Sequence, residues 1–422
     1  MADEAGRTTG GRGRHTRRSG THAADPPPTN ADSRSDPAIE MRTTPMQRRI
    51  DTPQPTRTMP RDYSISLAAA RAADTAILTP GRNRRQPMRG YEETFTDIID
   101  FILRCTHRIW DEKAVGYLYE HYRSNTRVVD DSGMVYGRDQ VIENTLRFIA
   151  AFPDLGIYAD EIIWCGDENS GFWTSHRAVL LGHNTGWSEW GPPTGRKIVV
   201  TCIANCYSIE NQIADEFVIY NTGSLLRQLG YDLRSHAARA SSGQDRAARF
   251  GEVERLLGQS APPQPDKGDG AEFDIERFVR ATLHEIWNWR LLDTITAAYA
   301  PGIRFHGPTD REIYARGQYT AYVLGLLASF PDLGFQIDDL YWMGNDQDGY
   351  LAAVRWTIVG THRGPGPYGQ PTGRQVHMWG ITHLQVRDRQ ITEEWTVSNE
   401  FDVLCQIATP AEPATGIAPR CD

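Results

Sequence analysis

Apolar residues recur every three or four positions in two stretches of the chain, from about Glu92 to Trp110 and from Phe273 to Trp289. This period places them on one side of a helix, so the sequence predicts two amphipathic helices. Beyond each of them the pattern predicts a short helix, a strand and a longer helix. The short helices are expected at 114–122 and 291–299, the strands around 128–129 and 304–306, and the longer helices at 138–151 and 316–329.

After residues 151 and 329 the pattern changes to β-branched and aromatic residues interrupted by Gly and Asp, which is typical of strands. In the second half of the chain these strands are expected near 336–343, 350–361, 375–387 and 390–397, and the first half matches them. Helices followed by a long series of strands favour an α+β fold.

The segment Phe152-Pro153-Asp154-Leu155-Gly156 occurs again, unchanged, 178 positions later at 330–334. With that offset kept, 22 of the 70 positions from 152 to 221 are identical between the two copies. Composition alone would give roughly one identity in fifteen positions, so the chain contains one domain twice. Because proline cannot continue a helix, we expect this segment to end the helix before it in each copy.

The expected architecture is therefore two tandem cone-shaped domains, each a curved antiparallel sheet wrapped around N-terminal helices. We place them at 91–231 and 272–410, joined by a linker at 232–271 that is rich in Ala, Ser, Gly and Pro and carries one helix at 246–257. Residues 1–90 are rich in Arg and poor in periodic apolar positions, which predicts a disordered tail. A second tail is expected at 411–422.

Charge is distributed unevenly along the chain. Residues 1–90 hold 16 Arg, no Lys and nine acidic residues, a local balance of +7, so the net charge of −9 leaves −16 on the remainder. An acidic folded part argues against nucleic acid as a partner. No apolar run is long enough for a membrane span or a signal peptide. Six Cys without a CxxC pair indicate reduced thiols and a cytoplasmic protein.

Alternation along the last two strands of the second domain predicts a pocket. Residues two apart in a strand share a face, and on one face of each strand most residues are apolar, so we expect that face to point inward. Polar groups among inward aromatic residues are typical of a small-molecule site. The residues on this face are His377, Trp379, Ile381 and His383 in one strand and Ile391, Glu393, Trp395, Val397 and Asn399 in the other, with His306 expected to reach the same mouth.

The first domain has different residues at these positions, Val199, Asn205, Asp215 and Phe217 in place of His377, His383, Glu393 and Trp395. It carries His176 and Arg177 instead. Arg177 and Arg355 occupy one repeated position, where an arginine can pair with an acid or bind a substrate carboxylate. The candidates for binding a substrate are Trp379, Trp395, His377, Arg355, Trp342, His176, Arg177 and Asn221.

The order of Phe-Pro-Asp-Leu, Gly-Thr-His-Arg-Gly at 360–364, Pro-Thr-Gly-Arg at 371–374 and the strand 391–395 resembles the SnoaL-like polyketide (ester) cyclase family. The resemblance covers both copies, at about 92–230 and 273–408. It implies the cone fold of nuclear transport factor 2 and cofactor-free ring closure of a polyketide ester by an intramolecular aldol reaction. This chemistry needs a base beside the carbonyl groups and donors that stabilise an enolate.

In that family the acid/base group is an aspartate four residues after the Trp of the Glu-Trp strand, and here Asn399 and its counterpart Asn221 stand at that place. An amide does not accept a proton at neutral pH, although it can donate a hydrogen bond to an enolate. The sequence therefore predicts His306, His383 or Glu393 as the base, with Asn399 as a donor.

Three hypotheses about function remain open at this stage. The chain is an enzyme that acts on a hydrophobic carbonyl compound by acid/base chemistry, a non-catalytic binding protein for such a molecule, or a module in which one domain serves as the built-in dimer partner of the other. No metal site, cofactor, phosphate loop or dinucleotide fingerprint is predicted. The expected partners are a hydrophobic small molecule and the second domain itself, with no nucleic acid and no membrane.

Overall fold

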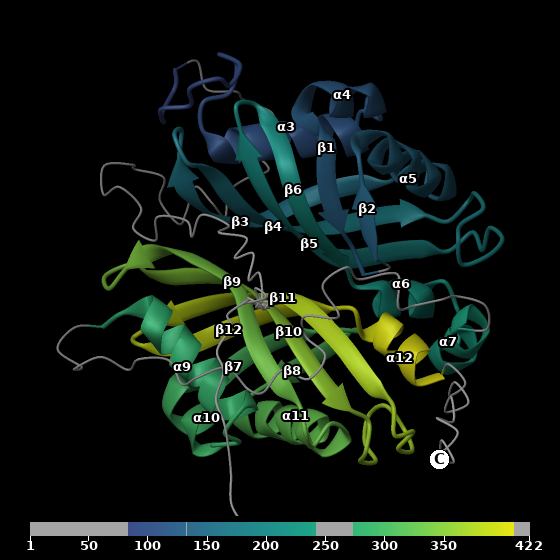
Figure 1. Cartoon of the computed structure of the whole chain (residues 1–422), viewed down its shortest axis with the longest axis vertical. Coiled ribbons are helices and arrows are strands. Elements are labelled where there is room, and N and C mark those ends of the chain that lie inside the picture. Colours follow the sequence, from purple (N-terminus) through teal and green to yellow (C-terminus); the bar gives the residue numbers. More distant parts are fainter. Residues whose placement is uncertain (1–82, 132, 242–272, 409–422) are drawn as a thin grey trace, which may run out of the picture. The chain divides into compact units, whose positions relative to one another are not determined.

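The computed structural model describes residues 83–131, 133–241 and 273–408, which form two domains with one six-stranded sheet each (Figure 1). The expected α+β fold with two tandem domains is confirmed. Residues 1–82 of the predicted first tail, 242–271 of the predicted linker with its helix, and the predicted tail at 411–422 lie outside the described residues. The bounds proposed for the domains stay a prediction.

The first domain begins with helix α3 (Ile98–Trp110), the short helices η1 (Val115–Tyr117) and α4 (Leu118–His121), and strands β1 (Tyr122–Val129) and β2 (Met134–Tyr136). Helix α5 (Arg138–Ala151) follows, and then strands β3 (Gly156–Asp167), β4 (Gly171–His183), β5 (Lys197–Ile209) and β6 (Gln212–Tyr220). Helices α6 (Thr222–Gln228) and α7 (Leu233–Ser241) end it. Two residues from the stretch predicted as tail, Gln86 and Met88, are buried against this domain.

The second domain repeats this order. It comprises α9 (Ile275–Trp287), α10 (Asp293–Ala298), β7 (Tyr299–Gly307), β8 (Arg311–Tyr314), α11 (Arg316–Ser329), β9 (Gly334–Asn345), β10 (Gly349–Thr361), β11 (Gln375–Arg387), β12 (Gln390–Ser398) and α12 (Glu400–Ala408). Helices α5 and α11 have the predicted bounds, because Phe152-Pro153 and Phe330-Pro331 stop them.

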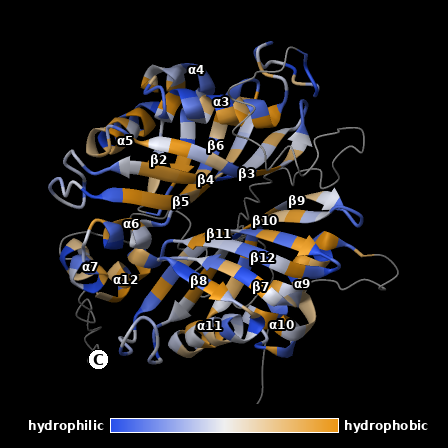
Figure 2. Ribbon diagram, turned by 180° about the vertical axis from the view of Figure 1, so that it is seen from behind, coloured by the Kyte–Doolittle hydropathy of each residue, from blue (hydrophilic) through white to orange (hydrophobic). Residues whose placement is uncertain are grey.

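The strand order is β2-β1-β6-β5-β4-β3 in the first sheet and β8-β7-β12-β11-β10-β9 in the second. Four pairings in each sheet are antiparallel, as expected, but β1 pairs with β6 and β7 with β12 in parallel. The sequence did not predict this pairing, because the two strands that meet are separated by the whole meander. The result is a mixed sheet that wraps around its helices (Figures 1 and 2).

The repeated Phe-Pro-Asp-Leu segment also fastens the end of each helix to a strand. Asp154 Oδ1 accepts a hydrogen bond from the His183 amide at 2.7 Å, and Asp332 Oδ1 accepts one from the Thr361 amide at 2.6 Å. The loop that follows passes so close to the helix that a Cβ on Gly186 would lie 1.8 Å from the Ala150 carbonyl oxygen. Only glycine fits there, and Gly364 stands in the same position against Ala328.

The outer faces of the two sheets pack against each other with an approximate twofold relation. Ile203 and Ile219 of the first domain form an apolar cluster with residues of the second, Trp379, Ile381 and Val397. The guanidinium of Arg177 lies 3.8 Å from the Trp395 ring centroid, and that of Arg355 lies 3.8 Å from the Phe217 ring centroid. Arg177 and Arg355 occupy one repeated position, and Phe217 and Trp395 occupy another. Each domain therefore contributes the same two side chains to the other, as in the interface of a symmetric dimer. The arrangement fits an intramolecular pseudo-dimer.

None of the helices within the described ranges has the length and apolar character that a membrane crossing would require.

Candidate functional site

Most residues of β11 and β12 that were predicted to point inward point outward, toward the first domain. Ile391, which precedes an irregularity in β12, is the exception and lies in the core of the second domain. His383 contacts Ser175 and Glu161 of the first domain, whereas the alternating residues Met378 and Leu384 lie in the core of the second. The prediction was wrong because both faces of this sheet are buried and apolar. Apolar alternation therefore gives no sign of which face is inner, and an error of one residue exchanges every side chain.

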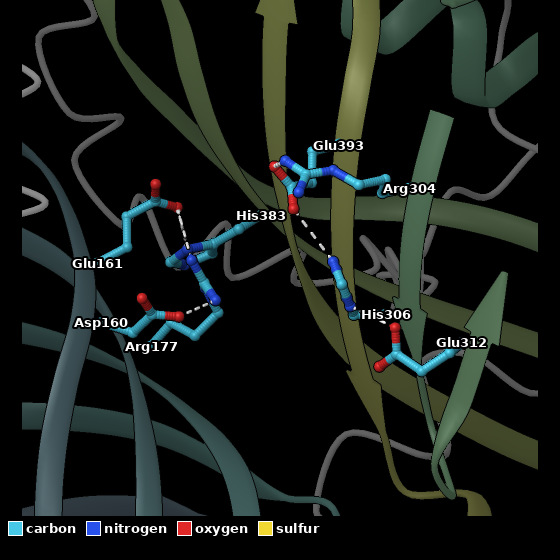
Figure 3. A network of polar contacts seen from close by, with 8 residues as sticks. All are labelled: Asp160, Glu161, Arg177, Arg304, His306, Glu312, His383 and Glu393. Carbon is cyan, nitrogen blue, oxygen red and sulfur yellow. Dashed lines mark hydrogen bonds and ion pairs between the residues drawn. The ribbon is translucent and has the colours of Figure 1, made fainter. Parts of the chain in front are cut away.

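His383 forms the centre of a polar network between the domains (Figure 3). Its Nδ1 lies 3.0 Å from Glu161 Oε1 and its Nε2 lies 2.7 Å from Ser175 Oγ. Ser175 Oγ also donates to Asn205 Oδ1 at 2.5 Å. A serine, a histidine and a carboxylate in this order are the groups of a hydrolytic triad, but all three are fully buried in the domain interface and leave no access for a substrate.

The other predicted base residues lie at the rim of the same interface. His306 Nε2 lies 3.1 Å from Glu393 Oε1, and its Nδ1 lies 2.6 Å from Glu312 (Figure 3). The His306 ring stacks on Trp395 with centroids 5.1 Å apart, and Arg304 pairs with Glu393. Every one of these groups is on the outer face, so the structure brings the predicted base candidates together outside the cone.

Arg177 and Arg355 both have the acid partner that the sequence allowed as one alternative. Arg177 pairs with Asp160, and Arg355 Nη1 lies 3.6 Å from Asp338 Oδ2. The predicted substrate-binding residue Trp342 packs against the core of the second domain. His377 lies on the outer face of β11, where its amide donates to Gln406 Oε1 at 2.8 Å.

The inner face of the second sheet is filled by aromatic side chains around Glu394. The hydroxyls of Tyr299 and Tyr319 donate to Glu394 Oε2 at 3.1 and 3.0 Å, and Thr396 Oγ1 donates to Oε1 at 3.0 Å. Burial raises the pKa of Glu394 to about 7 although these hydrogen bonds favour the carboxylate.

This raised pKa predicts a loss of stability with rising pH. The folded chain holds the Glu394 proton up to about pH 7, whereas the unfolded chain releases it near 4.5. The contribution is therefore full below pH 4.5 and lost as pH rises through 7, by about 3 kcal/mol for a fully buried group. We expect Glu394→Gln to show a smaller fall in unfolding free energy between pH 5 and 8 than the parent chain, measured by denaturant titration. An equal fall in both proteins would contradict this, and Glu143→Gln on the exposed side of α5 serves as the control.

The first domain has smaller residues where the second is filled. Ala178 occupies the repeated position of Trp356, and Val128 and Val141 occupy those of Phe305 and Tyr319. Trp356 in turn needs a glycine beside it, since a Cβ on Gly380 would lie 2.6 Å from its ring. The exchange of large for small side chains leaves the interior of the first cone open.

A cavity of about 840 Å³ occupies this interior. Its wall is largely apolar and includes aromatic side chains and four thiols. The aromatic residues are Trp110, Tyr122, Phe148, Trp187, Trp190, Tyr220 and Phe401, and the thiols are Cys105, Cys202, Cys206 and Cys405. The size and lining are those of a small-molecule site.

Part of the wall comes from the second domain. Phe401, Asp402 and Cys405 of α12 line the cavity of the first domain, and the Phe401 ring lies 5.8 Å from the His236 ring of α7. Leu404, also on α12, packs against the core of the second domain. The cavity is therefore closed only when both domains are present.

Glu216 lies on β6 with its carboxyl group in the cavity, at the position that repeats as Glu394. Tyr122, at the start of the parallel partner strand β1, donates its hydroxyl to Glu216 Oε2 at 2.9 Å. The pKa of Glu216 is raised to about 7, mainly by burial. The nearby Asp215 and Asp130 carboxylates also raise it, and the Tyr122 hydrogen bond lowers it. A carboxyl group with this pKa can both accept and return a proton at neutral pH.

His176 lines the same cavity from β4, the only predicted site residue found there. Its side chain is 5% exposed and its Nε2 has no hydrogen-bond partner. Burial, with a contribution from the neighbouring His383 and Arg177, lowers the pKa of His176 to about 4, so the imidazole is neutral at physiological pH. Asp131 also reaches the cavity, where burial and the carboxylate of Asp130 raise its pKa well above the usual range.

Glu216 was not predicted as a site residue, although it is identical to its counterpart in the repeat, Glu394. Alternation placed Asp215 and Glu393 inward, one residue away. The signal that would have found the cavity was the size difference between Ala178 and Trp356 in the aligned copies. A group compact enough to hold a metal ion lies elsewhere, at Glu92, Glu120 and His121.

Comparison with known proteins gives a family for the second half of the chain. The model of the SnoaL-like polyketide cyclase family matches residues 277–407. The second domain is SnoaL-like. No curated protein matches the chain.

Two solved structures are each similar to about a third of this chain. One, named "Putative SnoaL-like polyketide cyclase" from Jannaschia sp. CCS1, is 19% identical, covers 34% of this chain and 100% of its own, and has a TM-score of 0.29. The other is IdmH, "a putative polyketide cyclase" from Streptomyces antibioticus, 26% identical, covering 32% of this chain and 98% of its own, with a TM-score of 0.28.

The asparagines at the position of the aspartate of the SnoaL-like family make backbone hydrogen bonds. Asn399 Oδ1 accepts from the Trp379 amide at 2.9 Å and its Nδ2 donates to the His377 carbonyl at 3.4 Å. Asn221 Oδ1 accepts from the Thr309 amide of the other domain at 2.8 Å. Asn399 thus fastens α12 to β11, and Asn221 holds the domains together.

Proposed function

We propose that the first domain binds a hydrophobic carbonyl compound in its cavity and catalyses a cofactor-free acid/base reaction on it, as a SnoaL-like cyclase or isomerase. The observation that carries this proposal is the Glu216 carboxyl group, with a pKa of about 7, inside an apolar cavity of about 840 Å³. The same proposal assigns the second, filled domain a supporting role.

The proposed chemistry uses groups that already line the cavity. Glu216 as the carboxylate removes a proton from the carbon next to the substrate carbonyl, and the Tyr122 hydroxyl, donating to Glu216 Oε2, stabilises the carboxylate before the transfer. The electron pair left on carbon moves onto the carbonyl oxygen. The neutral imidazole of His176 donates a hydrogen bond to that oxygen from a ring nitrogen that carries a proton. Glu216 then returns the proton to the product.

The outer-face residues His306, His383, Glu393 and Asn399, which the sequence proposed for catalysis, have a better-supported role in this scheme. His383 joins the two domains through Glu161 and Ser175, as do Arg177 and Arg355 through Trp395 and Phe217. His306, Glu393 and Asn399 make their hydrogen bonds within the second domain. The filled interior of the second domain favours the hypothesis that this domain is the built-in partner of the first. The five described cysteines, all free thiols, support a cytoplasmic location for the protein.

Native mass spectrometry of the full chain, purified from its producer, tests for the ligand. The expected result is a bound small molecule that is released by denaturation, followed by turnover when a panel of polyketide-like ketones and esters is added. Binding without turnover across the panel would favour the non-catalytic alternative. Neither binding nor turnover would contradict the proposal.

Substitutions on α12 test whether the second domain contributes directly to ligand binding in the cavity. We expect Phe401→Ala to weaken ligand binding about tenfold, because it removes aromatic contact area from the wall. Quenching of the intrinsic fluorescence of the cavity tryptophans measures the affinity. Leu404→Ala on the same helix faces the core of the second domain and serves as the matched control. Equal affinities for the parent and Phe401→Ala would show that α12 does not contact the ligand.

A further inference from the structure

Glu92, Glu120 and His121 converge in the first domain, at the end of α4 that leads into β1. Glu92 precedes α3, and the other two residues end α4. His121 Nε2 lies 3.6 Å from Glu92 Oε1 and 4.0 Å from Glu120 Oε2, and one ligand atom of each residue lies within 4.8 Å of the others. The carboxylates are 45% and 68% exposed, whereas His121 is fully buried.

The hydrogen bond that Nδ1 of His121 makes determines the tautomer of the ring. Nδ1 lies 3.2 Å from the Asn211 carbonyl oxygen, which only accepts, so Nδ1 carries the proton. The ring is held by Tyr117, whose centroid is 3.9 Å away, and by the edges of Phe95 and Phe101. Nε2 is buried and has no hydrogen-bond partner. Its lone pair is therefore fixed in the direction of the two carboxylates.

Three acceptors facing one another need a cation between them. A divalent metal ion satisfies all three acceptors at once. Nitrogen and oxygen ligands bound to Zn²⁺ at about 2.0–2.2 Å in a tetrahedron are separated by roughly 3.3–3.5 Å. The distance between His121 and Glu92 is close to this value, and a small rotation of the exposed Glu120 side chain brings its oxygen into range.

The hydrogen bonds around His121 and Glu92 are of the kind found around metal ligands. A ligating histidine commonly donates its second N–H to a backbone carbonyl, which fixes the ring and makes the free nitrogen more basic. Asn211 does this for His121 and also donates its Nδ2 to Glu92 Oε1 at 3.1 Å. One residue of the turn between β5 and β6 thus orients two of the three side chains.

We propose that Glu92, Glu120 and His121 bind a divalent transition-metal ion, with Zn²⁺ the best match to one imidazole and two carboxylates. Solvent at the exposed side completes the coordination. The ion fastens the segment before α3 to α4 and, through Asn211, to the β5–β6 turn. The site is independent of the function proposed for the cavity.

Calorimetric titration of the chelator-treated full chain with ZnCl₂ tests the proposal. One equivalent of Zn²⁺ is expected to bind, and Co²⁺ in its place should give the visible absorption of a tetrahedral site. Glu92→Gln and Glu120→Gln should each weaken Zn²⁺ binding at least about tenfold, since each removes one charged ligand. Both side chains are largely exposed, so these variants should keep the fold, which circular dichroism verifies.

The matched control is Glu112→Gln, because Glu112 Oε1 lies 3.7 Å from His107 Nε2 in a comparable surface pair. It should leave Zn²⁺ binding unchanged. The proposal is overturned if no equivalent of Zn²⁺ binds, if the double Glu92→Gln and Glu120→Gln variant binds as tightly as the parent, or if Glu112→Gln weakens binding as much as the other two.

Discussion

Glu216→Gln is expected to lower the turnover of a carbonyl substrate by at least about a hundredfold while leaving its affinity within a few-fold. The amide keeps the shape of the side chain and still accepts a hydrogen bond from Tyr122, but it cannot carry a proton between substrate atoms. A loss confined to turnover is typical of a group that acts in the chemical step. The measurement is kcat and KM of both proteins on the best substrate of the panel.

The repeat supplies the matched control for this prediction. Glu394 has the same position, the same type of tyrosine donor and the same pKa of about 7, but its surroundings are filled with aromatic side chains. Glu394→Gln should therefore keep the turnover of the parent chain. If both variants lose turnover equally, the effect comes from folding and not from proton transfer. If Glu216→Gln retains full turnover, the assignment of the base is wrong.

The pH dependence of turnover by the parent chain should agree with the same assignment. The base form of Glu216 predominates above its pKa of about 7, so kcat/KM is expected to rise with pH through that value. Below it the carboxyl group is protonated and cannot start the reaction.

Glu161→Ala is expected to lower the free energy of unfolding by about 3–5 kcal/mol. Glu161 is 1% exposed, and its removal leaves His383 without its acid partner and takes a carboxylate from beside Arg177, inside the domain interface. Removing one member of a buried charge pair costs this much because the remaining group stays out of water without compensation. Denaturant titration of the full chain measures the loss.

Two further variants test whether the loss of stability comes from the contact between Glu161 and His383 or from the removal of a side chain in general. Glu143→Ala, half exposed on α5, should change the unfolding free energy by no more than about 0.5 kcal/mol. His383→Asn introduces the residue that the first domain carries at the repeated position, Asn205. Combined with Glu161→Ala it should cost less than the sum of the two single changes, since the groups act on each other. Additive losses, or a loss below about 1 kcal/mol for Glu161→Ala alone, would disprove the importance of this network.

The pseudo-dimer explains why a chain with one open cavity keeps two domains. The second domain buries the outer face of the first sheet and adds α12 to the wall of the cavity. Its own interior is filled with Trp356, Phe305 and Tyr319. In the proposed function, the first domain binds the ligand and the second supports it.

Local patterns were sufficient for the elements and their repetition. The helical period, the two prolines after Phe152 and Phe330, and the 178-residue offset depend only on neighbouring residues or on comparing the chain with itself. They therefore predicted two α+β domains and the bounds of α5 and α11 without any knowledge of packing. The placement of Arg177 and Arg355 beside an acid was also within reach, because the acids repeat at the same offset.

The tertiary structure alone decided which face of each strand is inner. On β11 and β12 the residues of both faces are shielded from water, one by the cone and the other by the first domain, so the sequence shows apolar residues on both. For the same reason His383 joined a network with Glu161 and Ser175, more than 200 positions away, instead of a pocket. The open interior of the first domain and the convergence of Glu92 with His121 likewise depend on side chains from distant segments, and no local pattern carries that information.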